Sequence, residues 1–114
     1  MKIKKADDVE ARAVETDGAD GVTIRLLIHE TDAAPNFYMR QFNIAPGGHT
    51  PRHVHAWEHE VYILCGSALV WSADGERPAA GGDCVFIPPN EEHQFTNAGD
   101  DELKMLCLVP KDSG

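Results

Sequence analysis

Residues 47–66 of this chain read GGHTPRHVHAWEHEVYILCG, and three histidines fall within seven positions of that stretch. His53 and His55 are two residues apart, so on a β-strand both imidazoles project from the same face, with Cα atoms roughly 6.6 Å apart. His59 follows after three further residues, which is long enough for a tight corner and a return on the next strand. This spacing allows three imidazoles to converge on one point.

A fourth histidine, His93, belongs to a distant stretch, residues 82–97, which reads GDCVFIPPNEEHQFTN. Alternation along a strand sends Gln94 and Thr96 to the outer face and places His93 and Phe95 inside. Independent burial of several imidazoles without partners would cost about 1–3 kcal/mol each. Neutral imidazoles are, however, ordinary ligands of Zn, Mn, Fe, Cu and Ni. The four histidines together therefore predict a site for one divalent transition metal.

The remaining sequence consists mostly of short apolar runs separated by Gly, Pro, Asn and Asp, a texture typical of an all-β sandwich or barrel. Candidate strands cover residues 22–29, 36–44, 53–55, 60–65, 67–72, 83–87, 93–96 and 103–109, and one helical turn is expected within residues 5–13. In the last strand the charged Lys104 points to solvent, so the opposite set of side chains faces the core. That set is Leu103, Met105, Cys107 and Val109.

Length, composition and charge restrict the classes of protein that this chain can be. With 114 residues, 42% of them apolar and 25% charged, it has the make-up of one folded domain. The formal net charge of −9 argues against nucleic-acid partners and anionic membrane surfaces. The sequence has no apolar run long enough for a membrane span and no signal-peptide pattern, so a cytoplasmic protein is expected. The three cysteines, each within an apolar run, are interpreted as buried, reduced thiols.

Two spaced motifs in the histidine-bearing stretches resemble the signature motifs of the cupin superfamily. The first reads G-x5-H-x-H-x3-H-x6-G over residues 47–66, and the second reads G-x5-P-x-N-x2-H-x3-N over residues 82–97. The resemblance implies a single cupin domain over residues 1–114, with the double-stranded β-helix, or jelly-roll barrel, of that family. Residues 1–46 would then form an N-terminal segment with extra strands. The chain is most similar to small bacterial cupins with a four-histidine site, several of which hold manganese, so Mn is expected ahead of Fe, Cu, Ni or Zn.

Two positions depart from the usual cupin pattern. The usual motif carries Glu where His59 stands, and Glu60 occupies an alternative spacing. Only His59 keeps the six-residue interval to Gly66, so His59 is assigned as the ligand, with Glu60 facing outward as the rival candidate. Asn90 replaces a glycine, and Asn is the other residue that best tolerates a positive φ, so the turn before His93 should survive.

The resemblance leaves three functions open. The first is an O2- or peroxide-dependent oxidoreductase, dioxygenase-like, that acts on a small apolar or aromatic molecule at the metal. The second is a metal-dependent isomerase, lyase or hydrolase, in which the ion polarises a carbonyl and a base moves a proton. The third is a binding or sensing module without turnover, and fold alone does not choose among the three. The oxidative function is preferred because the inferred lining is apolar and offers no obvious base.

Five residues are candidates for the lining of the pocket beside the metal: Phe95, Met105, Cys107, Trp57 and Arg40. Trp57 stands either at the pocket mouth or as a buried plug at the corner between His55 and His59. Arg40 either recognises a carboxylate or is solvated or part of an interface. A homodimer is expected, because small cupins commonly exchange N-terminal strands and because Leu106 and Leu108 lie on the outer face of the last strand.

Overall fold

Nine antiparallel strands form one curled sheet in the computed structural model, which describes residues 1–113. Two 3-10 helices accompany them, η1 (Ala6–Asp8) and η2 (Glu30–Asp32). The strands are β1 (Arg12–Ala13), β2 (Asp20–Ile28), β3 (Phe37–His49), β4 (His59–Cys65), β5 (Ser67–Ser72), β6 (Gly75–Ala80), β7 (Cys84–Ile87), β8 (His93–Asn97) and β9 (Leu103–Pro110).

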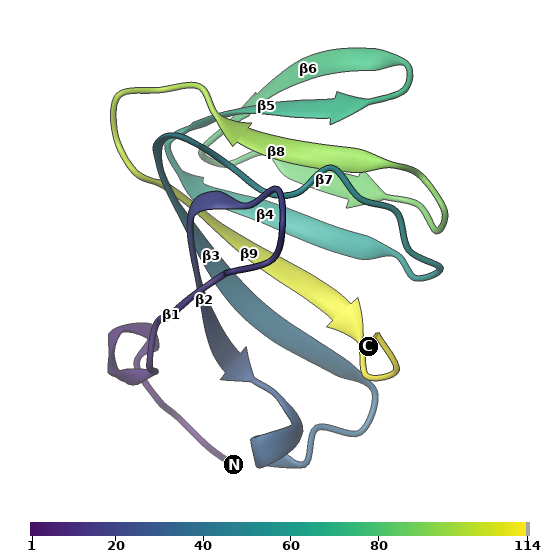
Figure 1. Cartoon of the computed structure of the whole chain (residues 1–114). Coiled ribbons are helices and arrows are strands. Elements are labelled where there is room, and N and C mark those ends of the chain that lie inside the picture. Colours follow the sequence, from purple (N-terminus) through teal and green to yellow (C-terminus); the bar gives the residue numbers. More distant parts are fainter. Residues whose placement is uncertain (114) are drawn as a thin grey trace.

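The long strand β3 connects the two halves of this sheet. Its first part pairs with β2 on one side and with β9 on the other, whereas His49 at its end pairs with Thr96 of β8. As Figure 1 shows, β5, β6 and β8 lie together on one side of the molecule and β2, β3 and β9 on the other. The full order is β6-β5-β8-β3-β9-β4-β7, with β2 beside β3 and β1 beside β2. The predicted all-β barrel is confirmed.

Alternation along the strands fills the interior with apolar side chains. In β9 the predicted inward set is buried: Leu103, Met105, Cys107 and Val109. The register of β3 against β9 pairs Arg40 with Cys107 and Phe42 with Met105. Because paired residues of adjacent strands project from the same face of a sheet, Arg40 and Phe42 also face the interior.

The strand boundaries differ from the sequence prediction at two places. Residues 53–55 do not form a strand, because only an isolated bridge links His53 to His93. Strand β6 was not predicted, since its sequence GERPAA is polar and contains a proline. It forms because a turn brings it back against β5, and Pro78 is tolerated because β6 pairs on one side only. The expected helical turn near the N-terminus is η1.

The prediction that all three cysteines are buried is wrong for two of them. Cys107 is buried, but Cys65 and Cys84 are exposed, and all three are free thiols. Cys84 pairs with Tyr62 on the outer face of the sheet, and Cys65 is the last residue of β4. An apolar run therefore identified a strand in each case without identifying the face from which the cysteine projects.

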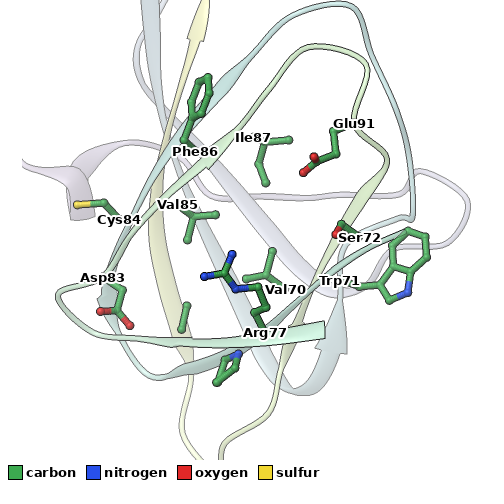
Figure 2. Close-up of a pocket in the computed structure, with 12 residues that line it drawn as sticks. Val70, Trp71, Ser72, Arg77, Asp83, Cys84, Val85, Phe86, Ile87 and Glu91 are labelled. Carbon is green, nitrogen blue, oxygen red and sulfur yellow. The ribbon is translucent and has the colours of Figure 1, made fainter. Parts of the chain in front are cut away.

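The barrel is not fully closed, because β6 and β7 end the strand order without pairing to each other in the part of the chain described. A cavity of about 390 Å³ lies in this gap, between the β5–β6 hairpin and β7 (Figure 2). Val70, Val85 and Ile87 contribute apolar walls, and Arg77 and Asp83 contribute charge. None of the histidines lines this gap. Within residues 1–113, no helix has the length and apolarity needed to traverse a bilayer.

Candidate metal centre

Four histidines from three parts of the chain meet inside the barrel. His59 begins β4 and His93 begins β8, whereas His53 and His55 lie in the connection between β3 and β4. The backbones of His53 and His93 hydrogen-bond to each other in both directions, at 3.1 and 3.0 Å, which fixes the connection against β8. One ligand atom from each histidine lies within 4.8 Å of those of the other three.

Backbone carbonyls orient three of the four imidazoles. In each case Nδ1 lies within hydrogen-bonding distance of a carbonyl oxygen: His53 with Pro51 at 2.7 Å, His55 with Trp57 at 3.0 Å and His93 with Glu91 at 2.8 Å. A carbonyl oxygen can only accept, so each Nδ1 must carry the proton and donate it. In a neutral ring this leaves the Nε2 lone pair free, which is the state that binds a metal.

His59 has a different partner. Its Nδ1 lies 2.9 Å from the Sγ of Cys107, and its Nε2 lies 2.6 Å from the Nε2 of His55. Two ring nitrogens facing each other at this distance repel unless a proton or a cation lies between their lone pairs. An Nε2–H of His59 that donates to the free Nε2 of His55 satisfies this contact, and so does a cation shared by both rings when each ring carries its proton on Nδ1. The donor set and its convergence therefore fit a transition-metal ion.

Burial favours the uncharged form of three of the four imidazoles, those of His55, His59 and His93. His93 is 1% exposed and His59 is 8% exposed. Burial, together with the neighbouring His55, lowers the pKa of His59 to about 3. Burial also lowers the pKa values of His55 and His93 from their usual value. These imidazoles are neutral near pH 7, so a metal ion would not have to displace protons from them.

The cluster opens into a cavity of about 570 Å³. Its walls are largely apolar, and they come from β2, β3, β4, β8 and β9: Val22, Ile24, Phe42, Val61, Phe95 and Met105. All five residues that the sequence suggested for the lining reach this cavity: Phe95, Met105, Cys107, Trp57 and Arg40. The Trp57 ring stacks on that of His55, with centroids 4.5 Å apart and planes within 1°, so it is part of the cavity wall.

Sequence reasoning missed the contribution of β2 to the lining, and that of Phe42 on β3. Ile24 and Phe42 pair with each other in the β2–β3 register and face the cavity together. Alternation around Arg40 could have suggested Phe42, but nothing in the sequence shows which face of β3 is inward. Glu60 is exposed on the outer face of β4, while His59 points inward. Tyr62, two residues further along β4, is 43% exposed on that same outer face, so its hydroxyl does not enter the cavity either.

Arg40 lies in the cavity wall on β3. Its Nη2 donates a hydrogen bond to the Sγ of Cys107 at 3.2 Å, and its guanidinium carbon lies 5.2 Å from the centre of the Phe42 ring. The same sulfur contacts His59, so Cys107 links the arginine to the histidine cluster. Burial raises the pKa of the Cys107 thiol above its usual value. The group between Arg40 and His59 is therefore a neutral thiol at pH 7 rather than a counter-ion.

Comparison with known proteins gives the following relatives. The model of the cupin domain family matches residues 40–109. The crystal structure of the polyketide cyclase RemF from Streptomyces resistomycificus superposes with a TM-score of 0.93 and 35% identity, over 98% of this chain and 80% of RemF. An uncharacterized protein of Methanocaldococcus jannaschii, MJ1618, is 30% identical over 114 residues, 94% of this chain and 86% of that protein. The polyketide synthase CurC of Streptomyces cyaneus is 29% identical over 111 residues, 92% of this chain and 72% of CurC.

Proposed function

This chain belongs to the cupin family, and we propose that it is a metal-dependent enzyme acting on a small, largely apolar organic molecule. In this proposal His53, His55, His59 and His93 hold one divalent transition-metal ion. The observation that carries the proposal is the convergence of four imidazoles at the wall of an apolar cavity of about 570 Å³. A ligand cavity next to open metal positions is the usual arrangement of a catalytic site.

The chemistry of the ligand set favours catalysis over a purely structural site. Four imidazoles contribute no negative charge, so the full +2 charge of the ion acts on whatever binds beside it. An octahedral ion would keep one or two positions open for a substrate. For the native metal we propose manganese, on the resemblance to small four-histidine cupins, with Fe, Cu, Ni and Zn as alternatives. Elemental analysis of protein purified without an affinity tag tests that choice.

For the reaction we propose Lewis-acid chemistry at a carbonyl group, such as cyclisation. RemF is described as a polyketide cyclase, and it is similar to this chain over nearly the whole of it. When bound, the ion would polarise a carbonyl and make its carbon more electrophilic toward an enol carbon of the same molecule. A C–C bond would form as the carbonyl π bond breaks, and the enol O–H proton would pass to the resulting alkoxide. The chain itself would hold a flexible substrate against apolar walls, among them Phe42, Phe95 and Met105, and exclude water from the reacting atoms.

An O2- or peroxide-dependent oxidoreductase, dioxygenase-like, is the second candidate. The apolar lining favours it, because such walls suit an aromatic substrate and separate reactive oxygen species from water. Glu60 and Tyr62 both lie on the outer face, so neither supplies a base inside the cavity. That arrangement leaves the exposed Glu15 as the only carboxylate among the residues that line the cavity, and it keeps the oxidative candidate open. A binding module without turnover is the third.

One experiment separates these functions. Metal-free protein is loaded with Mn, Fe, Cu or Zn and incubated with aryl β-diketones and triketones, in air and under anaerobic conditions, and product masses are recorded. Cyclisation predicts products of unchanged mass, or lighter by one water, that form with Zn and without oxygen. Oxidation predicts oxygen incorporation with the redox metals only. His53→Ala should abolish either activity, whereas His49→Ala, outside the cluster, should not. Ligand binding without any product would support the third function, a binding module without turnover.

We also propose that the chain forms a homodimer in the cytoplasm, without nucleic-acid partners. The net charge of −9 supports the proposal that nucleic acids are not partners, because the chain and the phosphate backbone repel each other. The outer face of β3, β9, β4 and β7 carries a set of exposed or half-buried apolar side chains that we call the outer apolar face: Phe37, Tyr62, Leu64, Phe86, Leu106 and Leu108. A face of this kind is suited to burial against a second copy.

A further inference from the structure

We infer that Arg40 binds the carboxylate of an anionic substrate and thereby selects carboxylic acids with an apolar or aromatic body. The inference rests on the proposed function, because it assigns a substrate class to the same cavity. It is carried by three features of Arg40: its direction, its lack of a counter-ion, and its place beside the histidine cluster.

The direction of Arg40 follows from strand register. It pairs with Leu26 of β2 and with Cys107 of β9, and Cys107 is buried in the interior. The arginine side chain therefore projects from the inner face of β3 and lines the 570 Å³ cavity with Phe42. It is the only lysine or arginine among the residues that line this cavity.

Arg40 has no anionic partner in the part of the chain described. The ion pairs of residues 1–113 involve Lys2, Lys4 and Arg12, and none involves Arg40. Its Nε is buried without a hydrogen-bond partner. A guanidinium offers five N–H donors in a planar fork that matches a carboxylate, and leaving such a group unpaired in a low-dielectric site is costly. A bound carboxylate would supply the missing acceptors and the missing charge.

The charges around the cavity also favour an anion. Of the residues that line it, only Glu15 carries a carboxylate, and that residue is exposed at the end formed by the segment between β1 and β2. The Cys107 sulfur contacts both Arg40 and His59, so a carboxylate on Arg40 would lie beside the histidine cluster. Phe42, below the guanidinium, continues into the apolar wall and would contact the body of the ligand.

Equilibrium binding tests the inference without relying on activity. Cinnamate, benzoate and salicylate are titrated by calorimetry against the metal-free and the Zn-loaded protein, each beside its neutral amide. We expect the carboxylates to bind the metal-free protein at least about tenfold more tightly than the amides, since a charge-assisted pair with an arginine contributes on this scale. The metal-free arm excludes coordination of the carboxylate by the ion.

Three variants complete the design. Arg40→Gln should abolish the preference for carboxylates, Arg40→Lys should retain part of it, and Arg77→Gln, which removes an exposed arginine on β6 outside this cavity, should retain all of it. Equal binding of acid and amide, no saturable binding of the acids, or an unchanged preference in Arg40→Gln would overturn the inference.

The titrations of metal-free protein test the role of Arg40 independently of the proposed function. If elemental analysis finds no metal in the wild-type protein, or if no conversion is detected, the proposed function fails, yet the titrations of metal-free protein still report on Arg40. Conversely, if the protein is an active metal enzyme but does not prefer carboxylic acids, the inference about Arg40 fails and the proposed function stands.

Discussion

At the scale of single residues, the four clustered histidines differ in the group that holds each ring. Three imidazoles donate Nδ1–H to rigid backbone carbonyls, but His59 depends on the sulfur of Cys107. A thiol forms weaker hydrogen bonds than a carbonyl oxygen does, whether it donates or accepts. The group that contacts the other ring nitrogen of a ligand histidine sets its orientation and basicity. His59 should therefore be the most adjustable of the four, and its assignment as a ligand has the most direct test.

Substitution separates His59 from its rival Glu60. His59→Ala should lose most of the bound metal, because it removes one of the four converging imidazoles. Glu60→Gln should retain metal near one equivalent, because that side chain is exposed on the outer face. Elemental analysis after exhaustive dialysis measures both. The reverse pattern would assign the site to three histidines and one glutamate, with one unit less positive charge.

Acid should destabilise the metal-free protein through the same residue. The pKa of His59 is about 3 in the folded chain, against roughly 6.5 for an unperturbed histidine. Between these pH values the unfolded chain takes up a proton that the folded chain does not. The contribution of His59 to the free energy of unfolding is therefore fully present above pH 6.5 and is lost as the pH falls toward 3. The lowered pKa values of His55 and His93 act in the same direction.

Urea unfolding at a series of pH values measures this slope. His59→Gln should flatten the dependence between pH 6.5 and pH 4, whereas His49→Gln, outside the cluster, should leave it unchanged. Identical slopes in the wild type and His59→Gln would show that His59 does not resist protonation in the folded state.

At the scale of elements, the connection from β4 to β5 controls how the chain passes between the two halves of the barrel. One residue, Gly66, separates Cys65 from Ser67. Its φ is +94°, and a Cβ at this position would lie 2.9 Å from the carbonyl oxygen of Glu102. Gly47 also has a positive φ, +79°, but a Cβ there would meet nothing within 4 Å. Asn90, predicted to tolerate the glycine position of the second motif, indeed has a φ of 66°.

The two glycines provide a matched pair of substitutions. Gly47→Ala should cost about 1–2 kcal/mol of unfolding free energy, from backbone strain alone. Gly66→Ala should cost about 1–3 kcal/mol more, because the added methyl group collides with the backbone before β9 and the strands must separate. Urea unfolding of both variants at neutral pH gives the comparison. Equal losses would mean that the β9 backbone yields to the methyl group at little cost.

At the scale of the whole molecule, apolar residues divide between two faces with different uses. The inner face forms the core and the cavity, whereas the outer apolar face remains exposed: Phe37 by 65%, Phe86 by 57% and Tyr62 by 43%. The register places Phe86 beside Glu60 and Glu60 beside Leu108, so the apolar side chains lie on neighbouring strands. Exposed aromatic residues grouped on one sheet are characteristic of an interface.

A single charge on this face should dissociate the proposed homodimer. Phe86→Glu should give a monomer in sedimentation velocity, because it places a carboxylate within an apolar contact. Val54→Glu, at a residue that is 54% exposed outside the sheet, is the matched control and should remain dimeric. Both variants should retain the wild-type circular dichroism. A monomeric wild type at tens of micromolar, or a dimeric Phe86→Glu, would contradict the proposal.

The sequence alone determined the fold class and the four histidines, because alternation, turn residues and metal-ligand spacing are local and appear in order along the chain. Even so, the local pattern wrongly predicted a strand at residues 53–55, and it wrongly predicted that Cys65 and Cys84 are buried. The tertiary structure decided the environment of Arg40, since strand register over 67 positions places it opposite Cys107 and beside His59. It also decided that no carboxylate pairs with that arginine in the part of the chain described, because a missing partner is a property of packing rather than of any segment.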